Sequence, residues 1–417
     1  MPTRTLVLAV GVSLALLAAA LALPAHAGAA RANLWVDRDG GSCRRSAPHW
    51  YLDGRACGGL HAAYAAAVGG DTILVRGGTY GRQVLPGGQK RLLIMNAPGG
   101  RPIVGTTTVR ASNITLAGFT IRRNDNADTA ATLEAFGNHN RFLRIRVNTL
   151  NRPGRQGIAA SGDWNLFKNG STANVVDEKG ALVGGSHVTF LHFKFHDVRA
   201  TNSVVHNECV YSLGPYLTVK RSHFWNCATM DLFITRGNYW TPPQAPYGGV
   251  TIENNVFEHP RMENGQGWHY YGLLFGGQLN FDGALLENIK VRYNTFETAV
   301  SLNSTFRAAG NSEWIGNVGG GWDCIPGMVY RNNVGEKCSA TDVRVSRPYS
   351  CGPPGCATVR TATQGWVNPA RHNFHLKRGA PAIGRGNSND FPPVDLDGRR
   401  RPIGAHPDAG AFEYRPH

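Results

Sequence analysis

The stretch from Val204 to Arg236 reads VVHNECVYSLGPYLTVKRSHFWNCATMDLFITR. Two runs rich in β-branched and aromatic residues are separated by a Gly-Pro break, and a cysteine lies near each end. Short runs that alternate apolar and polar residues are typical of half-buried strands, and Gly-Pro marks a turn. The stretch therefore predicts short strands that are joined by tight turns.

The same pattern recurs on both sides of this stretch, from about residue 90 onward. Each unit has a polar or glycine turn, then alternating apolar residues, and often an asparagine. The first series contains residues 112–121, 138–147, 162–169, 186–193, 215–220, 248–255 and 287–294. An interleaved second series contains residues 156–160, 179–184, 208–214, 230–235 and 271–276. Repeats at a spacing of roughly 22 to 40 residues indicate a solenoid.

Each coil of such a solenoid contributes one strand of each series to a parallel sheet. We expect the residues just before the strands of the second series to stack along the axis, about 4.8 Å apart. Asparagines at the turn ends tolerate left-handed geometry and can form ladders, so we expect them to be structural. They include Asn254, Asn255, Asn294, Asn317, Asn332 and Asn333.

An Ala-rich segment with helical periodicity, residues 58–68, precedes Gly70-Asp71-Thr72-Ile73-Leu74-Val75 and Gly77-Gly78-Thr79-Tyr80. This arrangement resembles the N-terminal cap and first coil of pectate-lyase-like right-handed β-helix proteins. The resemblance implies an all-β, right-handed parallel β-helix solenoid with an N-terminal helical cap. A helix there would cover the open apolar end of the solenoid. We expect the cap and first coil over residues 28–88 and the β-helix over residues 89–340.

The last part of the chain, residues 341–417, is expected to form a disulfide loop and a capping tail. The tail segments APAIG (380–384), DLDGR (395–399) and DAGAFEY (408–414) resemble the C-terminal segment called choice-of-anchor Q. That family usually has Ile or Val where Ala409 stands. We expect the tail to pack on the last coil.

The first residues predict export. An apolar run from Leu6 to Leu23 follows Arg4 and ends before the small-residue site Ala25-His26-Ala27. This is the plan of a signal peptide over residues 1–27, cleaved after Ala27, whereas an uncleaved anchor is the alternative. We therefore expect a secreted, monomeric protein without stable membrane insertion.

The eight cysteines support this prediction, because an even number in an exported chain indicates disulfides. The simplest connectivity joins sequence neighbours: Cys43 with Cys57, Cys209 with Cys227, Cys324 with Cys338, and Cys351 with Cys356.

The chain has 43 Lys and Arg against 28 Asp and Glu, a net charge of +15. A basic exported protein can bind an acidic polysaccharide, another glycan or a membrane surface. No compact run of Lys or Arg and no nucleic-acid-binding motif is present, so we expect no nucleic-acid partner.

The resemblance implies several activities, because β-helix proteins of this type include lyases of uronate polysaccharides, glycoside hydrolases, epimerases and adhesins. Elimination on a uronate needs a cation at the carboxylate and a base for the α-proton. The catalytic candidates are Lys179, His206, Glu208, Asp231 and Arg236. The substrate-binding candidates are Lys220, Arg221, Trp268, His269 and Tyr271. Possible Ca²⁺ ligands are Glu178, Glu208 and Asp231, because Ca²⁺ takes hard oxygen ligands.

Two alternatives to a lyase remain open. A hydrolase would use Glu208 and Asp231 as paired carboxylates, although the paired-Asp and G-H-G signatures of polygalacturonases are missing. A carbohydrate-binding or surface module without catalysis would need none of these side chains, each of which can also be an ordinary solvated residue.

Overall fold

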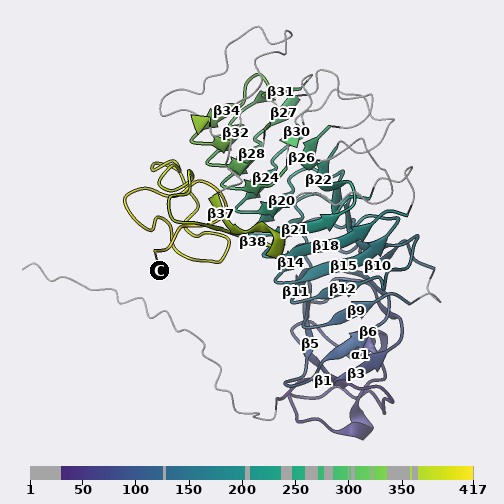
Figure 1. Ribbon diagram of the computed structural model, residues 1–417. Coiled ribbons are helices and arrows are strands. Elements are labelled where there is room, and N and C mark those ends of the chain that lie inside the picture. The colour runs from purple at the N-terminus through teal and green to yellow at the C-terminus, as the bar shows by residue number, and fades with distance from the viewer. Residues whose placement is uncertain are drawn as a thin grey trace, which may run out of the picture.

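The computed structural model describes residues 30–124, 128–201, 207–235, 247–258, 271–276, 285–298, 300–301, 306–319, 321–322, 324–335, 357–358 and 365–416. Within these ranges the chain forms a parallel β-solenoid with three long sheets (Figure 1). Successive coils contribute one strand to each sheet in turn, so strands that are neighbours in space lie one coil apart in sequence. The predicted fold is therefore confirmed.

The first sheet contains β1 (Leu34–Val36), β2 (Thr72–Val75), β5 (Leu92–Asn96), β8 (Ile114–Ala117), β11 (Arg141–Leu143), β14 (Leu166–Lys168), β17 (Thr189–Leu191), β20 (Thr218–Lys220), β24 (Thr251–Glu253), β28 (Lys290–Arg292), β32 (Glu313–Ile315) and β34 (Val329–Arg331). The second sheet contains β3 (Gly78–Tyr80), β6 (Pro102–Val104), β9 (Thr120–Arg122), β12 (Arg146–Asn148), β15 (Ser171–Val176), β18 (Lys194–Arg199), β21 (His223–Cys227), β25 (Val256–Phe257), β29 (Thr295–Phe296), β33 (Val318–Gly319), β35 (Val334–Gly335) and β36 (Ala357–Thr358).

The third sheet contains β4 (Gln83–Gly88), β7 (Thr107–Ala111), β10 (Ala131–Ala135), β13 (Gln156–Ala160), β16 (Ala181–Val183), β19 (Val210–Ser212), β22 (Met230–Ile234), β26 (Tyr271–Phe275) and β30 (Val300–Ser301). A short sheet contains β23 (Tyr247–Gly248), β27 (Leu285–Glu287) and β31 (Arg307–Ala309). The helices of the described residues are α1 (Leu60–Ala66) and two 3-10 turns, Asp53–Arg55 and Pro369–Arg371.

The core runs along the axis inside the three sheets. Phe195, Phe224, Phe257 and Phe296 stack on the inner face of the second sheet, with ring centroids 4.8 Å apart at each step. This distance matches the spacing of neighbouring strands, so one aromatic position per coil produces a continuous ring stack.

The corner between the first and second sheets is short and repeats in almost every coil. One residue takes left-handed backbone geometry there, as in Asn254 (φ 56°) and Tyr293 (φ 53°). In the later coils a fully buried asparagine follows it. The Asn255 and Asn294 amides donate hydrogen bonds to Asn294 and Asn317, respectively. The expected structural role of these asparagines is confirmed.

Helix α1 covers the start of the solenoid, as expected from residues 58–68. Leu60, Ala63 and Tyr64 are buried against the solenoid core. The Gln83 side chain accepts a hydrogen bond from the Leu60 amide (2.8 Å), and Lys90 donates one to the Tyr64 carbonyl (2.8 Å). Side chains from the first coils thereby satisfy both ends of the helix.

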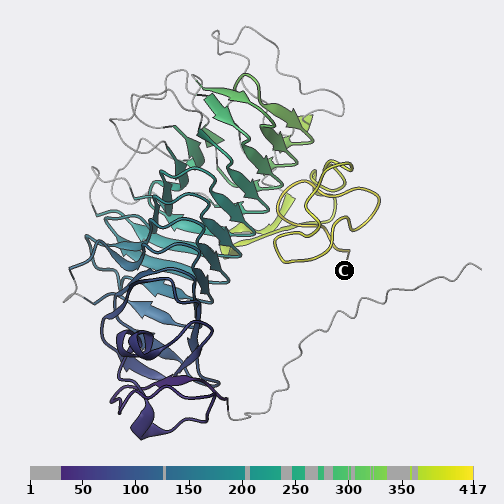
Figure 2. The same ribbon diagram turned by 180° about the vertical axis from the view of Figure 1, so that it is seen from behind.

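The C-terminal tail, residues 365–416, lies along the flank of the solenoid in both views (Figures 1 and 2). It begins with the antiparallel pair β37 (Trp366–Asn368) and β38 (Asn373–Leu376). Its apolar residues pack on Val256, Val318 and Val334 of the second sheet. The Arg221 side chain donates to the Leu396 carbonyl (3.0 Å), so the contact extends well beyond the expected last coil.

Two of the expected disulfides lie within the described residues and are confirmed, Cys43–Cys57 and Cys209–Cys227. Cys324 is also disulfide-bonded. The other predicted cysteines, Cys338, Cys351 and Cys356, lie outside the described residues, as does the predicted signal peptide. No helix in the described part of the chain is long and apolar enough to span a membrane.

Candidate functional site

The outer edge of the third sheet brings together part of the predicted site. The Gly180 amide donates to the Glu208 carbonyl (3.0 Å), and the Cys209 amide donates to the Met230 carbonyl (3.0 Å). Met230 in turn pairs with Tyr271. Lys179, Glu208, Met230 and Tyr271 therefore occupy equivalent positions in consecutive coils, at about the spacing of neighbouring strands. We call these four residues the edge column.

Within the edge column, Lys179 and Glu208 are neighbours from adjacent coils. The Lys179 ammonium lies 3.4 Å from a carboxylate oxygen of Glu178, and both side chains are partly exposed. Glu208 is fully buried. The partly exposed Lys179 therefore lies one strand away from the buried carboxyl group of Glu208.

Asp231 does not join the edge column, although the sequence suggested that it would pair with Glu208. Its position corresponds to Cys209 in the previous coil and to Gly272 in the next. Both positions face the interior: Cys209 belongs to the core, and a Cβ on Gly272 would contact Phe257 at 3.0 Å. At this corner two successive residues point inward, so the alternation that was used to place Asp231 fails.

The interior position has a strong effect on the Asp231 carboxyl group. The side chain is fully buried, and neither of its oxygens accepts a hydrogen bond. Burial, followed by the nearby carboxylates of Glu258 and Glu297, raises the pKa of Asp231 well above its usual range. The neutral form is favoured because ionisation here would leave an uncompensated charge in the interior.

This geometry corrects the predicted Ca²⁺ site. The carboxylates of Glu178, Glu208 and Asp231 do not converge as a Ca²⁺ site, because Asp231 turns into the solenoid. In the described part of the chain, only Asp37, Asp39 and Asp53 place three acidic ligand atoms within 4.8 Å of one another. Tyr51 donates its hydroxyl to Asp37 (2.6 Å) in this cluster. The sequence Asp37-Arg38-Asp39-Gly40 was its only signal, and we assign no ion to it.

Lys220 and Arg221 lie where β20 of the first sheet ends, and strand β21 of the second sheet separates them in the chain from the edge column. Lys220 ends β20 in the first sheet and forms an ion pair with Glu253 (3.2 Å). Arg221 holds the C-terminal tail through Leu396. The structure therefore places both residues away from the site for which they were predicted. His206, Arg236, Trp268 and His269 lie outside the described residues.

An apolar cluster on the outer face of the third sheet was missed by sequence reasoning. Met230, Phe233 and Leu274 are buried, and the partly exposed Tyr211 and Tyr271 pack against them. The rings of Tyr211 and Phe233 are stacked, with centroids 4.9 Å apart. The alternation within β19 and β22 could have revealed the cluster, because Tyr211 and Phe233 each lie between two inward-facing residues of their strand. Aromatic rings beside polar groups are common in binding sites for small ligands.

Several solved structures are similar to this chain. A pectate lyase, Pel9A, is 15% identical, covers 93% of this chain and 98% of its own, and has a TM-score of 0.47. The structure of XylC in complex with xylose is 9% identical over 73% of this chain and 75% of its own, with a TM-score of 0.50. A rhamnogalacturonan lyase is 11% identical over 80% of this chain and 90% of its own, with a TM-score of 0.40. Neither the family models nor the curated proteins gave a match. At these identities the likeness concerns the β-solenoid alone.

Proposed function

We propose that this protein is exported, binds an acidic polysaccharide along the edge column and cleaves it by β-elimination. The observation that carries the proposal is the placement of Lys179 beside Glu208 in consecutive coils, with Tyr271 in the same column. The net charge of +15 favours a polyanionic substrate. The aromatic cluster around Tyr211 offers an apolar surface for sugar rings.

In the proposed reaction a base removes the α-proton of the uronate, and the bond from the β-carbon to the glycosidic oxygen breaks. The electron pair of the broken C–H bond forms the new C=C double bond, and the leaving oxygen takes up a proton. No water is consumed. Lys179 is the candidate for neutralising the uronate carboxylate or accepting the proton, and Glu208 is the carboxyl group of the same column in the next coil.

The test is a panel of polyuronates, with cleavage followed by the ultraviolet absorbance of the unsaturated product. Lys179→Ala and Glu208→Gln should each abolish the signal while the folded circular dichroism spectrum is retained. Lys194→Ala is the matched control, because Lys194 is an exposed lysine on the second sheet. If activity survives in both edge-column variants, the edge column is not the working site.

The same assay separates the two alternatives. New reducing ends without ultraviolet absorbance would indicate hydrolysis. In that case Glu208 would need a partner carboxylate other than Asp231, because Asp231 points into the interior. Retained glycan binding without any cleavage would indicate a binding module. A parallel series with EDTA asks whether cleavage depends on a divalent cation, since loss of cleavage on chelation and recovery with Ca²⁺ would support a Ca²⁺ requirement.

A further inference from the structure

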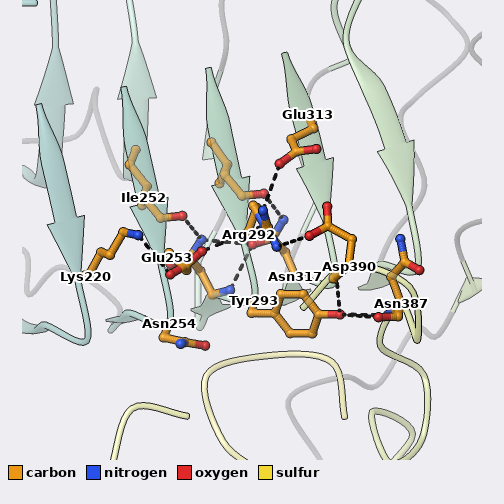
Figure 3. Close-up of polar contacts among 12 residues, drawn as sticks. Lys220, Ile252, Glu253, Asn254, Arg292, Tyr293, Glu313, Asn317, Asn387 and Asp390 are labelled. Carbon is orange, nitrogen blue, oxygen red and sulfur yellow. Dashed lines mark hydrogen bonds and ion pairs between the residues drawn. The ribbon is translucent and has the colours of Figure 1, made fainter. Parts of the chain in front are cut away.

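A polar groove lies between the later strands of the first sheet and the C-terminal tail. Its floor is the outer face of β28, β32 and β34, its far wall is the tail segment 384–390, and its volume is about 1010 Å³. Figure 3 shows the strands and the tail facing each other across this region. No residue of the edge column lines the groove.

The wall of this groove is held in place by several polar contacts. The Tyr293 hydroxyl accepts a hydrogen bond from the Asn387 amide (2.8 Å) and lies 3.2 Å from the Asp390 carbonyl. Asn332 donates to the Gly386 carbonyl (3.4 Å). A groove whose walls are fixed before binding loses less conformational entropy when a ligand arrives.

The two carboxylates of the groove lining, Glu313 and Asp390, share one arginine. Arg292 lies 3.2 Å from Glu313 and 2.6 Å from Asp390, and its third carboxylate neighbour is Glu253 at 3.9 Å (Figure 3). Arg292 therefore fastens the tail to the first sheet, and both carboxylates in the lining are engaged with a single guanidinium.

Three further cations, Lys290, Arg331 and Arg385, belong to the lining. Among the described residues, no side-chain hydrogen bond or ion pair is found for Arg331 or Arg385, and both are exposed, whereas Lys290 is close enough to Glu313 to lower the pKa of that carboxyl group. Lys290 and Arg331 come from β28 and β34, which are two strands apart, or about 10 Å. The groove thus offers separated positive charges, and an anion that binds there would displace no ion pair.

We propose that this groove is a binding site for a short stretch of an anionic glycan that carries more than one acid group. Lys290, Arg331 and Arg385 would bind the acid groups, and exposed amides and hydroxyls such as Asn311, Ser388 and Asn389 would bind sugar hydroxyls. Among the residues that the structure describes, the lining contains no Trp, Tyr or Phe side chain, which single-stranded nucleic acid uses for stacking.

This inference stands apart from cleavage at the edge column. The experiment is isothermal titration of the full chain with a defined oligogalacturonate and with its neutral methyl ester. All proteins carry Lys179→Ala, so that the probe is not cleaved. Arg331→Ala/Arg385→Ala should weaken binding of the acidic probe by roughly tenfold, and the ester should not bind.

The matched control is Arg91→Ala/Arg101→Ala, which removes the same charge from two exposed arginines near the first coils. It should change the affinity less than about twofold if the site is local. Equal loss in both double variants would mean general charge attraction, and unchanged binding in the groove variant would overturn the proposal. Failure of cleavage in the unmodified chain, with groove binding intact, would refute the proposed function alone.

Discussion

Two corners of the solenoid treat buried polar side chains in opposite ways. At the corner between the first and second sheets, the Asn294 amide donates to Ile252 and Asn317 and accepts from Asn255. The tail beside this corner buries Arg401 against Glu413, 2.7 Å apart and both without exposure. At the corner between the second and third sheets, Asp231 is equally buried and has no hydrogen bond at either oxygen.

The difference indicates which corner is built for stability. A buried polar group with its partners in place is close to neutral in free energy, and removing one partner is costly. A buried carboxyl group without partners lowers the free energy of unfolding. Such groups are most often found at functional sites, where a protein gives up stability. The edge column lies at this same corner, between the second and third sheets.

The largest effect is expected where the tail is fastened to the solenoid. Arg401→Ala would leave Glu413 buried without its cation and would remove hydrogen bonds to Asp408 and Gly410. We expect the free energy of unfolding to fall by about 3–5 kcal/mol, the usual cost of breaking a buried ion pair. Urea denaturation followed by tryptophan fluorescence measures this, because Trp366 lies in the tail core.

Arg400→Ala is the control for this variant, since Arg400 is exposed and adjacent in sequence. It should change the unfolding free energy by less than about 0.5 kcal/mol. An equally small change in the unfolding free energy for Arg401→Ala would mean that this ion pair does not hold the tail on the solenoid. The contrast between the two corners would then not extend to the tail.

A somewhat smaller effect is expected in the asparagine ladder. Asn294→Ala would remove the hydrogen bonds that the Ile252 carbonyl accepts from Asn294 and that the Asn255 backbone N–H donates to it in the interior. We expect a loss of roughly 2–3 kcal/mol in the free energy of unfolding. Asn311→Ala, at an exposed asparagine, is the control. Comparable small losses in both would mean that the ladder fixes the corner geometry without contributing to stability.

The two corners also differ in how far they could be predicted. The ladder and the strand series were visible because the same residue types return at the same place in each coil, as with Asn255, Asn294 and Asn317. The other corner carries connections of different length, so nothing in the sequence repeats there to fix the inward or outward direction of Asp231. Lys220 and Arg221 were misplaced for a related reason, since nearness in sequence does not say which sheet a residue faces.

Asp231 allows a test of the second-to-third corner by pH. Its folded-state pKa is raised by burial, so the native state holds a proton that the unfolded state releases as pH rises above about 4. The contribution of this proton to the free energy of unfolding is therefore fully present below that pH, and it is lost as pH rises toward the folded-state pKa of Asp231. Asp231→Asn removes this loss.

We expect Asp231→Asn to be more stable than the unmodified chain by roughly 1–3 kcal/mol near pH 8, with the difference shrinking toward about pH 4. Chemical denaturation at a series of pH values measures it. Asp163→Asn, on a partly exposed carboxyl group elsewhere, should show no such trend. A constant difference at all pH values would mean that Asp231 is not held neutral in the folded state.

The smallest effect is expected at Lys220, which the sequence assigned to substrate binding and the structure places on the first sheet. Its ion pair with Glu253 is partly exposed, and such pairs usually contribute less than about 1 kcal/mol. Lys220→Ala should therefore lower stability by no more than this and leave polyuronate cleavage unchanged, whereas Lys179→Ala should abolish it. Equal loss of cleavage in both variants would show that substrate contacts the first sheet as well, because a lysine on the first sheet can act only through a ligand that reaches it.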